Sequence, residues 1–76
     1  MKGRILYRNL GEKIFIARRK RKITQEQLSI LTDVDRTYIS QIEHGTRNPS
    51  FHILAKLSRE LKINVNELIP KKIGKP

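Results

Sequence analysis

Apolar residues recur along this chain at the spacing of α-helices, and short polar segments interrupt them. The first apolar stripe is Leu10, Ile14 and Ala17, and residues 53–61 carry another. Spacings of three and four residues place such side chains on one face of a helix. The pattern therefore predicts a compact all-α domain of five helices without strands: residues 9–20, 25–31, 36–44, a fourth helix that follows Ser50, and 64–69.

Polar residues at the expected helix ends support the two helices predicted at 25–31 and 36–44. Thr24 and Gln27 match a capping box, in which each side chain bonds the backbone N–H of the other residue. Asp33 suits a left-handed turn position, and Asp35 suits the N-cap of the next helix. Gly45 suits the positive φ at which helices commonly end. Residues 24–45 are thus predicted to be two short helices joined by a tight turn.

Similar residues mark the expected helix ends in the rest of the chain. Asn9 with Glu12 and Asn64 with Glu67 resemble helix starts, and Pro70 closes the last helix. Gly11 lies inside the first helix, where glycine costs up to about 1 kcal/mol relative to alanine, so we expect another helix to cross closely there. Three segments result: a basic N-terminal extension (1–8), the folded domain (9–70) and a basic C-terminal tail (71–76).

Composition narrows the class of protein. The chain has 76 residues, with 17 Lys and Arg against 7 Asp and Glu, a net charge of +10. Such an excess indicates a polyanionic partner, namely DNA, RNA or an acidic membrane surface, and a solvated surface without such a partner is the alternative. The absence of cysteine excludes disulfides and thiolate metal sites, and the two histidines lie far from any cluster of acids. We expect no metal, cofactor, small-molecule ligand or enzymatic activity.

Neither end of the chain nor its apolar runs suggest a membrane protein. The longest apolar run, residues 14–17, is much too short to span a bilayer, and we see no signal peptide. A cytoplasmic, nucleoid-associated protein is the expectation.

The predicted helix pair at residues 24–45 suggests how the chain could bind DNA. The major groove of DNA is about 12 Å wide and admits one α-helix, so a basic domain with such a helix pair is best explained as a protein that binds in the major groove. An ordinary surface hairpin of two helices is the alternative.

From Leu10 to Ile69 the chain resembles the Cro/lambda-repressor type of helix-turn-helix family, also called the xenobiotic-response-element-like regulators. The matching segments are LGEKI, ITQEQLS, ISQIEHG, RNPS and LKINVNELI. Within that family, DRTYISQIEHGTRNPS is most similar to the small controller proteins of restriction–modification systems. The resemblance implies a dimeric regulator of transcription, acting as repressor or activator, that binds a pseudo-palindromic site on double-stranded DNA. It also allows contact with RNA polymerase.

The resemblance assigns roles to individual residues. Residues 36–44 become the recognition helix, and the base contacts are expected from Arg36, Thr37, Ser40 and Gln41. Contacts with the DNA backbone are expected from Gln25, Tyr38, His44, Thr46, Arg47 and Asn48. Partial packing against the preceding helix is an alternative for Tyr38. Arg18 and Glu43 match a buried salt bridge between the first and third helices, and independent surface charges are the alternative.

Two groups of apolar residues call for separate explanations. We expect the dimer interface at Leu61, Ile63, Val65, Leu68 and Ile69, unless these residues close the core of the monomer. Phe15, Ile16, Ile30 and Leu31 occupy positions that are generally polar in the family. One hypothesis is that residues 5–7 fold back over them, and a second protein interface is the other.

Three rival functions remain open. An antitoxin-type repressor would use the same DNA chemistry and would also bind a toxin, for which Phe15, Ile16 and Ile30 are the candidate surface. A cationic protein on a membrane surface is less compatible with the capped, glycine-terminated helices. RNA binding usually relies on aromatic stacking, and this chain has only four aromatic residues.

Overall fold

The computed structural model describes the backbone of residues 2–68 and the side chains of residues 8–68. Within that range the chain forms four α-helices and one short 3₁₀ helix: α1 (Lys2–Lys20), α2 (Gln25–Thr32), α3 (Arg36–Glu43), α4 (Phe51–Leu61) and η1 (Val65–Glu67). The all-helical prediction is confirmed, and no strand occurs among these residues. The count of five α-helices is not confirmed, because the expected helix at 64–69 is a single 3₁₀ turn. Ile69, Pro70 and the predicted tail lie outside the described residues.

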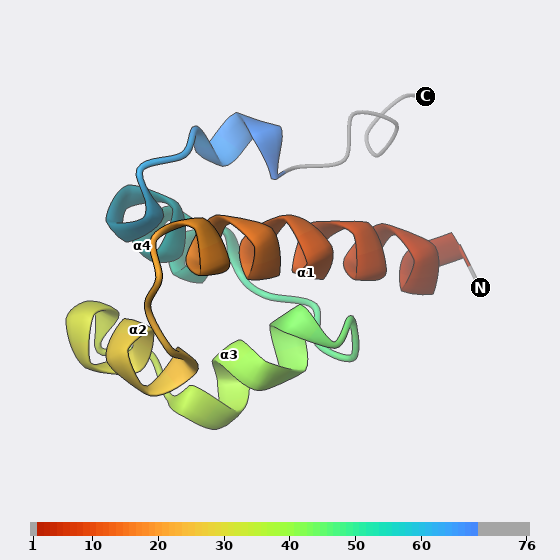
Figure 1. Cartoon of the computed structure of the whole chain (residues 1–76). Helices are drawn as coiled ribbons and strands as arrows, with labels where there is room; N and C mark the ends of the chain where they lie inside the picture. Colours follow the sequence, from red (N-terminus) through yellow and green to blue (C-terminus); the bar gives the residue numbers. More distant parts are fainter. Residues whose placement is uncertain (1, 69–76) are drawn as a thin grey trace.

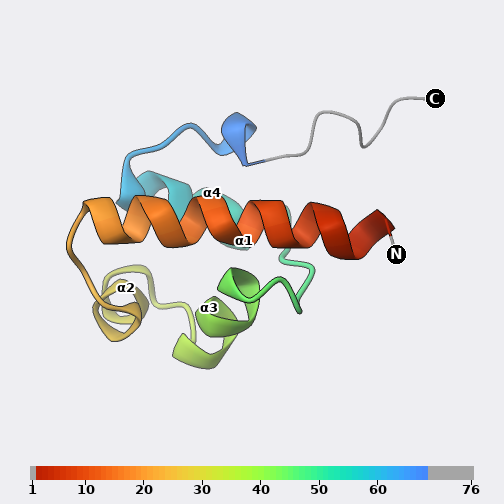
Figure 2. The ribbon, with the colours of Figure 1, turned by 45° about the vertical axis from the view of Figure 1, so that its right-hand side comes forward.

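The helices pack around α1, the longest of them. Figures 1 and 2 show α2 and α3 together on one side of α1 and η1 on the opposite side. α1 packs against both α3 and α4, while α2 also packs against α3 and α4. The pair α2–α3 therefore lies against the rest of the protein as a unit, with α3 at the periphery (Figure 1).

α1 begins earlier than the sequence pattern suggested. We expected its start at Asn9, but the helix runs without interruption from Lys2, so the expected division between residues 8 and 9 falls inside a helix. The hypothesis that residues 5–7 fold back over Phe15 and Ile16 is wrong. Each helical residue rises 1.5 Å, so segments ten residues apart on one continuous helix are separated by about 15 Å along its axis.

Most of the predicted caps are present. The Thr24 hydroxyl accepts from the N–H of Gln27 at 3.0 Å, and the Gln27 side chain accepts from the N–H of Thr24 at 2.7 Å. Asp33 has φ 60° and Gly45 has φ 75°, as expected for left-handed positions. Asp35 is the N-cap of α3, but its side chain makes no capping hydrogen bond, so only its position was predicted correctly.

Both predicted apolar stripes contribute to the buried core. Ile14, Leu28, Ile39, Ile42 and Leu57 are the largest side chains that are completely enclosed, and they come from all four α-helices. The four apolar residues that the resemblance left unexplained are at the surface: Phe15, Ile16, Ile30 and Leu31. Among the described helices, none has the length and apolar character needed to cross a membrane.

Gly11 marks the point where α1 crosses α3. A Cβ at this position would lie 2.1 Å from the carbonyl oxygen of Ile42 and 2.9 Å from that of Glu43. Both obstacles are backbone atoms, which cannot move aside as a flexible side chain can. The close crossing predicted from a glycine inside a helix is confirmed, and it sets the distance between α1 and α3.

Replacing Gly11 with alanine is expected to destabilise the protein by about 1–3 kcal/mol, the usual cost of overpacking a core. The clash outweighs the gain in helix propensity, which is at most about 1 kcal/mol. Urea unfolding followed by circular dichroism measures the difference. Glu12→Ala, at the exposed neighbouring position, is the matched control and is expected to change stability by less than about 0.5 kcal/mol. Equal stability of the two variants would contradict the role of Gly11.

Candidate nucleic-acid interface

α3 has one buried face and one polar face. Ile39 and Ile42 are 0% and 1% exposed and anchor the helix to the core. Arg36 and Thr37 are exposed, and Ser40 and Gln41 are half-buried. The residues predicted to contact bases therefore lie where the protein's own core does not cover them. A guanidinium, a hydroxyl and an amide offer hydrogen bonds suited to base edges in a major groove.

A buried ion pair joins α3 to α1. The Arg18 Nε donates to Glu43 Oε2 at 2.7 Å, and its Nη2 donates to Oε1 at 3.0 Å. The two side chains are 9% and 4% exposed, so the alternative of independent surface charges is excluded. The remaining Nη1 donates to the carbonyl of Ile23 at 2.9 Å. All three guanidinium nitrogens thus donate a hydrogen bond within the protein, so the role of Arg18 is to hold the end of α3.

Gln25 adds α2 to the same network. Its Nε2 donates to Glu43 Oε1 at 2.9 Å, and its side chain is half-buried. We expected Gln25 to hold a DNA phosphate, a role that remains a prediction, while its bond to Glu43 was not foreseen. Glu43 thus receives hydrogen bonds from α1 and α2 while belonging to α3. One carboxylate fixes the relative positions of three helices.

A second network lies on the polar side of α3. Arg47 Nε donates to Gln41 Oε1 at 2.9 Å, and its guanidinium carbon stacks 4.4 Å from the centre of the Tyr38 ring. The Tyr38 hydroxyl accepts from the N–H of Ser50 at 3.4 Å, which leaves its own O–H free to donate. A side-chain amide oxygen has two lone pairs, so Gln41 still has an acceptor position and both amide hydrogens for a base. The hydrogen bond from Arg47 orients the Gln41 side chain. The spacing of residues in the sequence did not predict this contact.

The remaining predicted backbone contacts lie at and beyond the end of α3. His44, Thr46 and Asn48 are exposed. With its proton on Nδ1, the His44 ring donates to the carbonyl of Ser40 at 2.8 Å. The Thr46 hydroxyl donates to the carbonyl of Gln41 at 3.2 Å. Both side chains therefore cap α3 in this structure, whereas Asn48 extends from the loop with an exposed amide.

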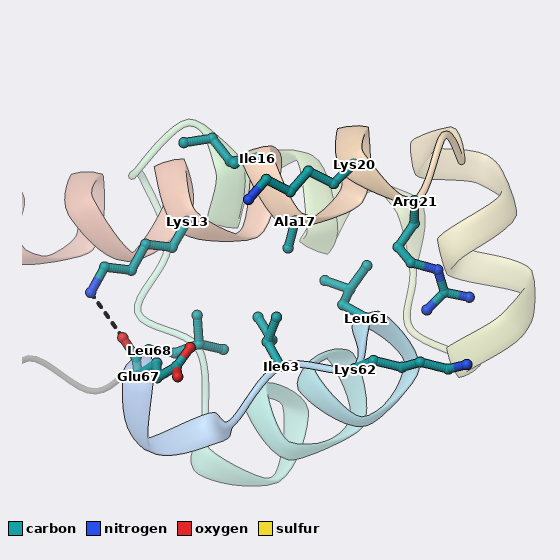
Figure 3. Close-up of a pocket in the computed structure, with 10 residues that line it drawn as sticks. All are labelled: Lys13, Ile16, Ala17, Lys20, Arg21, Leu61, Lys62, Ile63, Glu67 and Leu68. Atoms are coloured by element: carbon teal, nitrogen blue, oxygen red, sulfur yellow. Dashed lines mark hydrogen bonds between the residues drawn. The ribbon is translucent and has the colours of Figure 1, made fainter.

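An apolar groove of about 670 Å³ lies on the opposite side of α1, between that helix, the end of α4 and η1 (Figure 3). Leu61, Ile63 and Leu68 line it, with the cations of Lys13, Lys20, Arg21 and Lys62 around its edge (Figure 3). Leu61 and Leu68, two of the predicted dimer residues, are only 3% and 2% exposed and close the core of the protomer. Little of either side chain is left for a partner, because both are enclosed by the protein itself. Ile63 and Val65 are half-buried, and Ile69 lies outside the described residues.

No metal centre is formed in the part of the chain that the structure describes. Groups of three or more His, Asp or Glu side chains placed to hold an ion do not occur among residues 8–68. The site built around α3 consists of hydrogen-bond donors, acceptors and cations, which suit recognition of a polar anionic surface.

Comparisons with known proteins agree with this geometry. Residues 11–72 match the family described as a helix-turn-helix domain. The control protein C.BamHI of Bacillus amyloliquefaciens is 42% identical over 50 residues, which cover 66% of this chain and 62% of that protein. The control protein C.MunI of a Mycoplasma species is 42% identical over 53 residues, or 70% of this chain and 72% of that protein. The match therefore spans less than two thirds of the length of C.BamHI.

A solved structure extends the similarity to the whole fold. The restriction-modification controller protein C.AhdI from Aeromonas hydrophila superposes with a TM-score of 0.83 at 29% identity, covering 91% of this chain and 100% of that chain. The arrangement of α2 and α3 on α1 is thus shared with a protein of similar size.

Proposed function

We propose, from the premise that this chain belongs to the helix-turn-helix domain family, that it is a transcription regulator which binds specific sites on double-stranded DNA. The observation that carries this proposal is the polar face of α3. It is held rigidly from behind by Ile39, Ile42 and the Glu43 network, and it presents Arg36, Thr37 and Gln41 outward. A rigid helix of this kind fits the major groove, where Arg pairs with guanine and Gln with adenine.

We propose further that the protein acts as a homodimer. One short helix offers too few base contacts to discriminate a site within a genome, whereas two copies related by a two-fold axis read two half-sites about one helical turn apart. Ile63 and Val65 are the half-buried apolar residues from the predicted set that remain accessible, and Ile16, 45% exposed, lies at the edge of the same groove. This side of the protein is the proposed dimer surface, away from α3.

The similarity to control proteins supports a more specific proposal. As a controller of a restriction–modification system, the protein would bind the promoter of its own operon on the nucleoid, in the cytoplasm. Regulation would then depend on protein concentration and on how it occupies its sites, with contact to RNA polymerase as a route to activation.

Selection of binding sites from a random duplex pool tests these proposals together. We expect a dyad-symmetric motif whose half-sites are about one helical turn apart. Sedimentation of the protein with the selected duplex then gives the number of protomers bound. An asymmetric motif bound by one protomer would contradict the dimer, and the absence of any enriched motif would contradict sequence-specific binding.

Arg36→Ala is expected to weaken binding to the selected site by about 1–3 kcal/mol for each half-site, or roughly 5- to 150-fold for each, and to relax base preference at one position of each half-site. The reason is the loss of a bidentate contact with a base edge. Arg59→Ala on α4, which removes the same charge from another exposed position, is the control. If Arg36→Ala weakened binding to selected and random duplexes equally, Arg36 would be a phosphate contact instead.

A further inference from the structure

Gly45 brings α1 into direct contact with the loop that follows α3. A Cβ at Gly45 would lie 2.9 Å from the Cα, 3.2 Å from the N and 3.3 Å from the Cβ of Arg8. The left-handed φ of 75° at Gly45 also disfavours other residues there. The backbone of α1 at Arg8 is therefore fixed beside the end of the recognition helix, and the Arg8 side chain starts from that junction.

Arg8 is available for an external partner. Its side chain is exposed. Glu12, one turn further along α1, is the acidic group on the same face of that helix, but no ion pair joins the two. Among residues 8–68 the only salt bridge is the one between Arg18 and Glu43. By contrast, Arg47 in the neighbouring loop is already engaged with Gln41 and Tyr38.

The end of α3 needs a cation if it is to approach a phosphate. The C-terminus of a helix carries about half a negative charge, which repels an anionic backbone. The N–H groups of His44, Gly45 and Thr46 cap carbonyls in the last turn, and these bonds reduce the repulsion without reversing it. The described residues that add positive charge here are Arg8 and Arg47.

We infer that Arg8, together with the loop carrying Arg47 and Asn48, forms a phosphate clamp that binds the DNA backbone beside the recognition helix. This inference rests on the proposed function, because it requires α3 to enter the major groove. The loop at the end of α3 then faces the wall of that groove, which is the sugar-phosphate backbone. Arg8 contributes affinity and positioning but no base preference, since phosphates carry no sequence information directly.

Arg8→Gln tests the clamp in the full chain, with the duplex recovered by site selection. Each lost phosphate contact makes the negative slope of log affinity against log salt shallower by about 0.9. For a dimer that loses one contact per protomer, this slope is expected to change from about −8 to about −6. The loss of affinity should be equal for selected and random duplexes. Arg8→Lys should restore most of the slope, and Arg59→Gln on α4 should leave it unchanged.

Ethylation interference locates the contact on the DNA. We expect one phosphate in each half-site at which ethylation weakens wild-type binding but not Arg8→Gln binding. A slope for Arg8→Gln equal to that of Arg59→Gln, or an unchanged interference pattern, would overturn the clamp while leaving site-specific binding by Arg36 intact. Failure of the proposed function would instead appear in the wild type, as binding without sequence bias. Circular dichroism should show unchanged stability, because the Arg8 side chain is exposed.

Discussion

Glu43→Ala is expected to destabilise the protein by about 3–5 kcal/mol, the usual effect of removing one partner from a buried ion pair. Alanine leaves the Arg18 guanidinium enclosed, with the carbonyl of Ile23 as its remaining hydrogen-bond partner among the described residues. It also removes the acceptor for the Gln25 amide. Domains of this size are stable by roughly 4–11 kcal/mol, so a large part of the total is lost. The free energy of unfolding from urea titrations measures the effect.

Two further variants separate the ion pair from other consequences of the substitution. Glu12→Ala removes an exposed carboxylate of the same type from α1 and is expected to cost less than about 0.5 kcal/mol. The double variant Arg18→Met with Glu43→Leu removes both charges and replaces them with apolar volume. It should recover much of the loss, because the uncompensated buried charge is gone. Equal stability of Glu43→Ala and Glu12→Ala would mean that the ion pair contributes nothing to the fold.

Binding to the selected duplex is expected to weaken about 10⁵-fold between 50 and 200 mM salt. If each protomer neutralises about four to five phosphates, the release of condensed counterions gives a log–log slope of about −8 for the dimer. The net charge of +10 and the cationic loop after α3 supply the positive charge that this requires. Fluorescence anisotropy at a series of salt concentrations measures the slope.

The same titration on a random duplex is the control for specificity. Phosphate contacts are shared by all sequences, so the random duplex should also show a steep slope. Affinity for the selected duplex should remain higher at every salt concentration, since base contacts depend less on counterions. Loss of the preference at high salt would mean that binding is electrostatic throughout and that α3 does not read bases.

Local sequence signals were sufficient for most of the secondary structure. The capping box at Thr24 and Gln27, the left-handed positions at Asp33 and Gly45 and the apolar stripe of α4 depend on residues within one or two helical turns. Such interactions are visible in the order of residues alone. The start of α1 was misjudged for the complementary reason, because Asn9 resembles an N-cap but a helix can pass through such a residue when the preceding segment is also helical.

What the sequence determined by itself is therefore the helical pattern, the strong positive charge and the polar outer face of residues 36–44. Only the tertiary structure decided that Gln25 bonds Glu43, that Arg47 orients Gln41, that Leu61 and Leu68 close the core, and that Arg8 lies beside Gly45. These contacts join residues from different elements, and spacing along the chain does not encode how two helices are placed against each other. That placement follows from the packing of α1 against α3 at Gly11, where the absence of a side chain lets the two backbones meet.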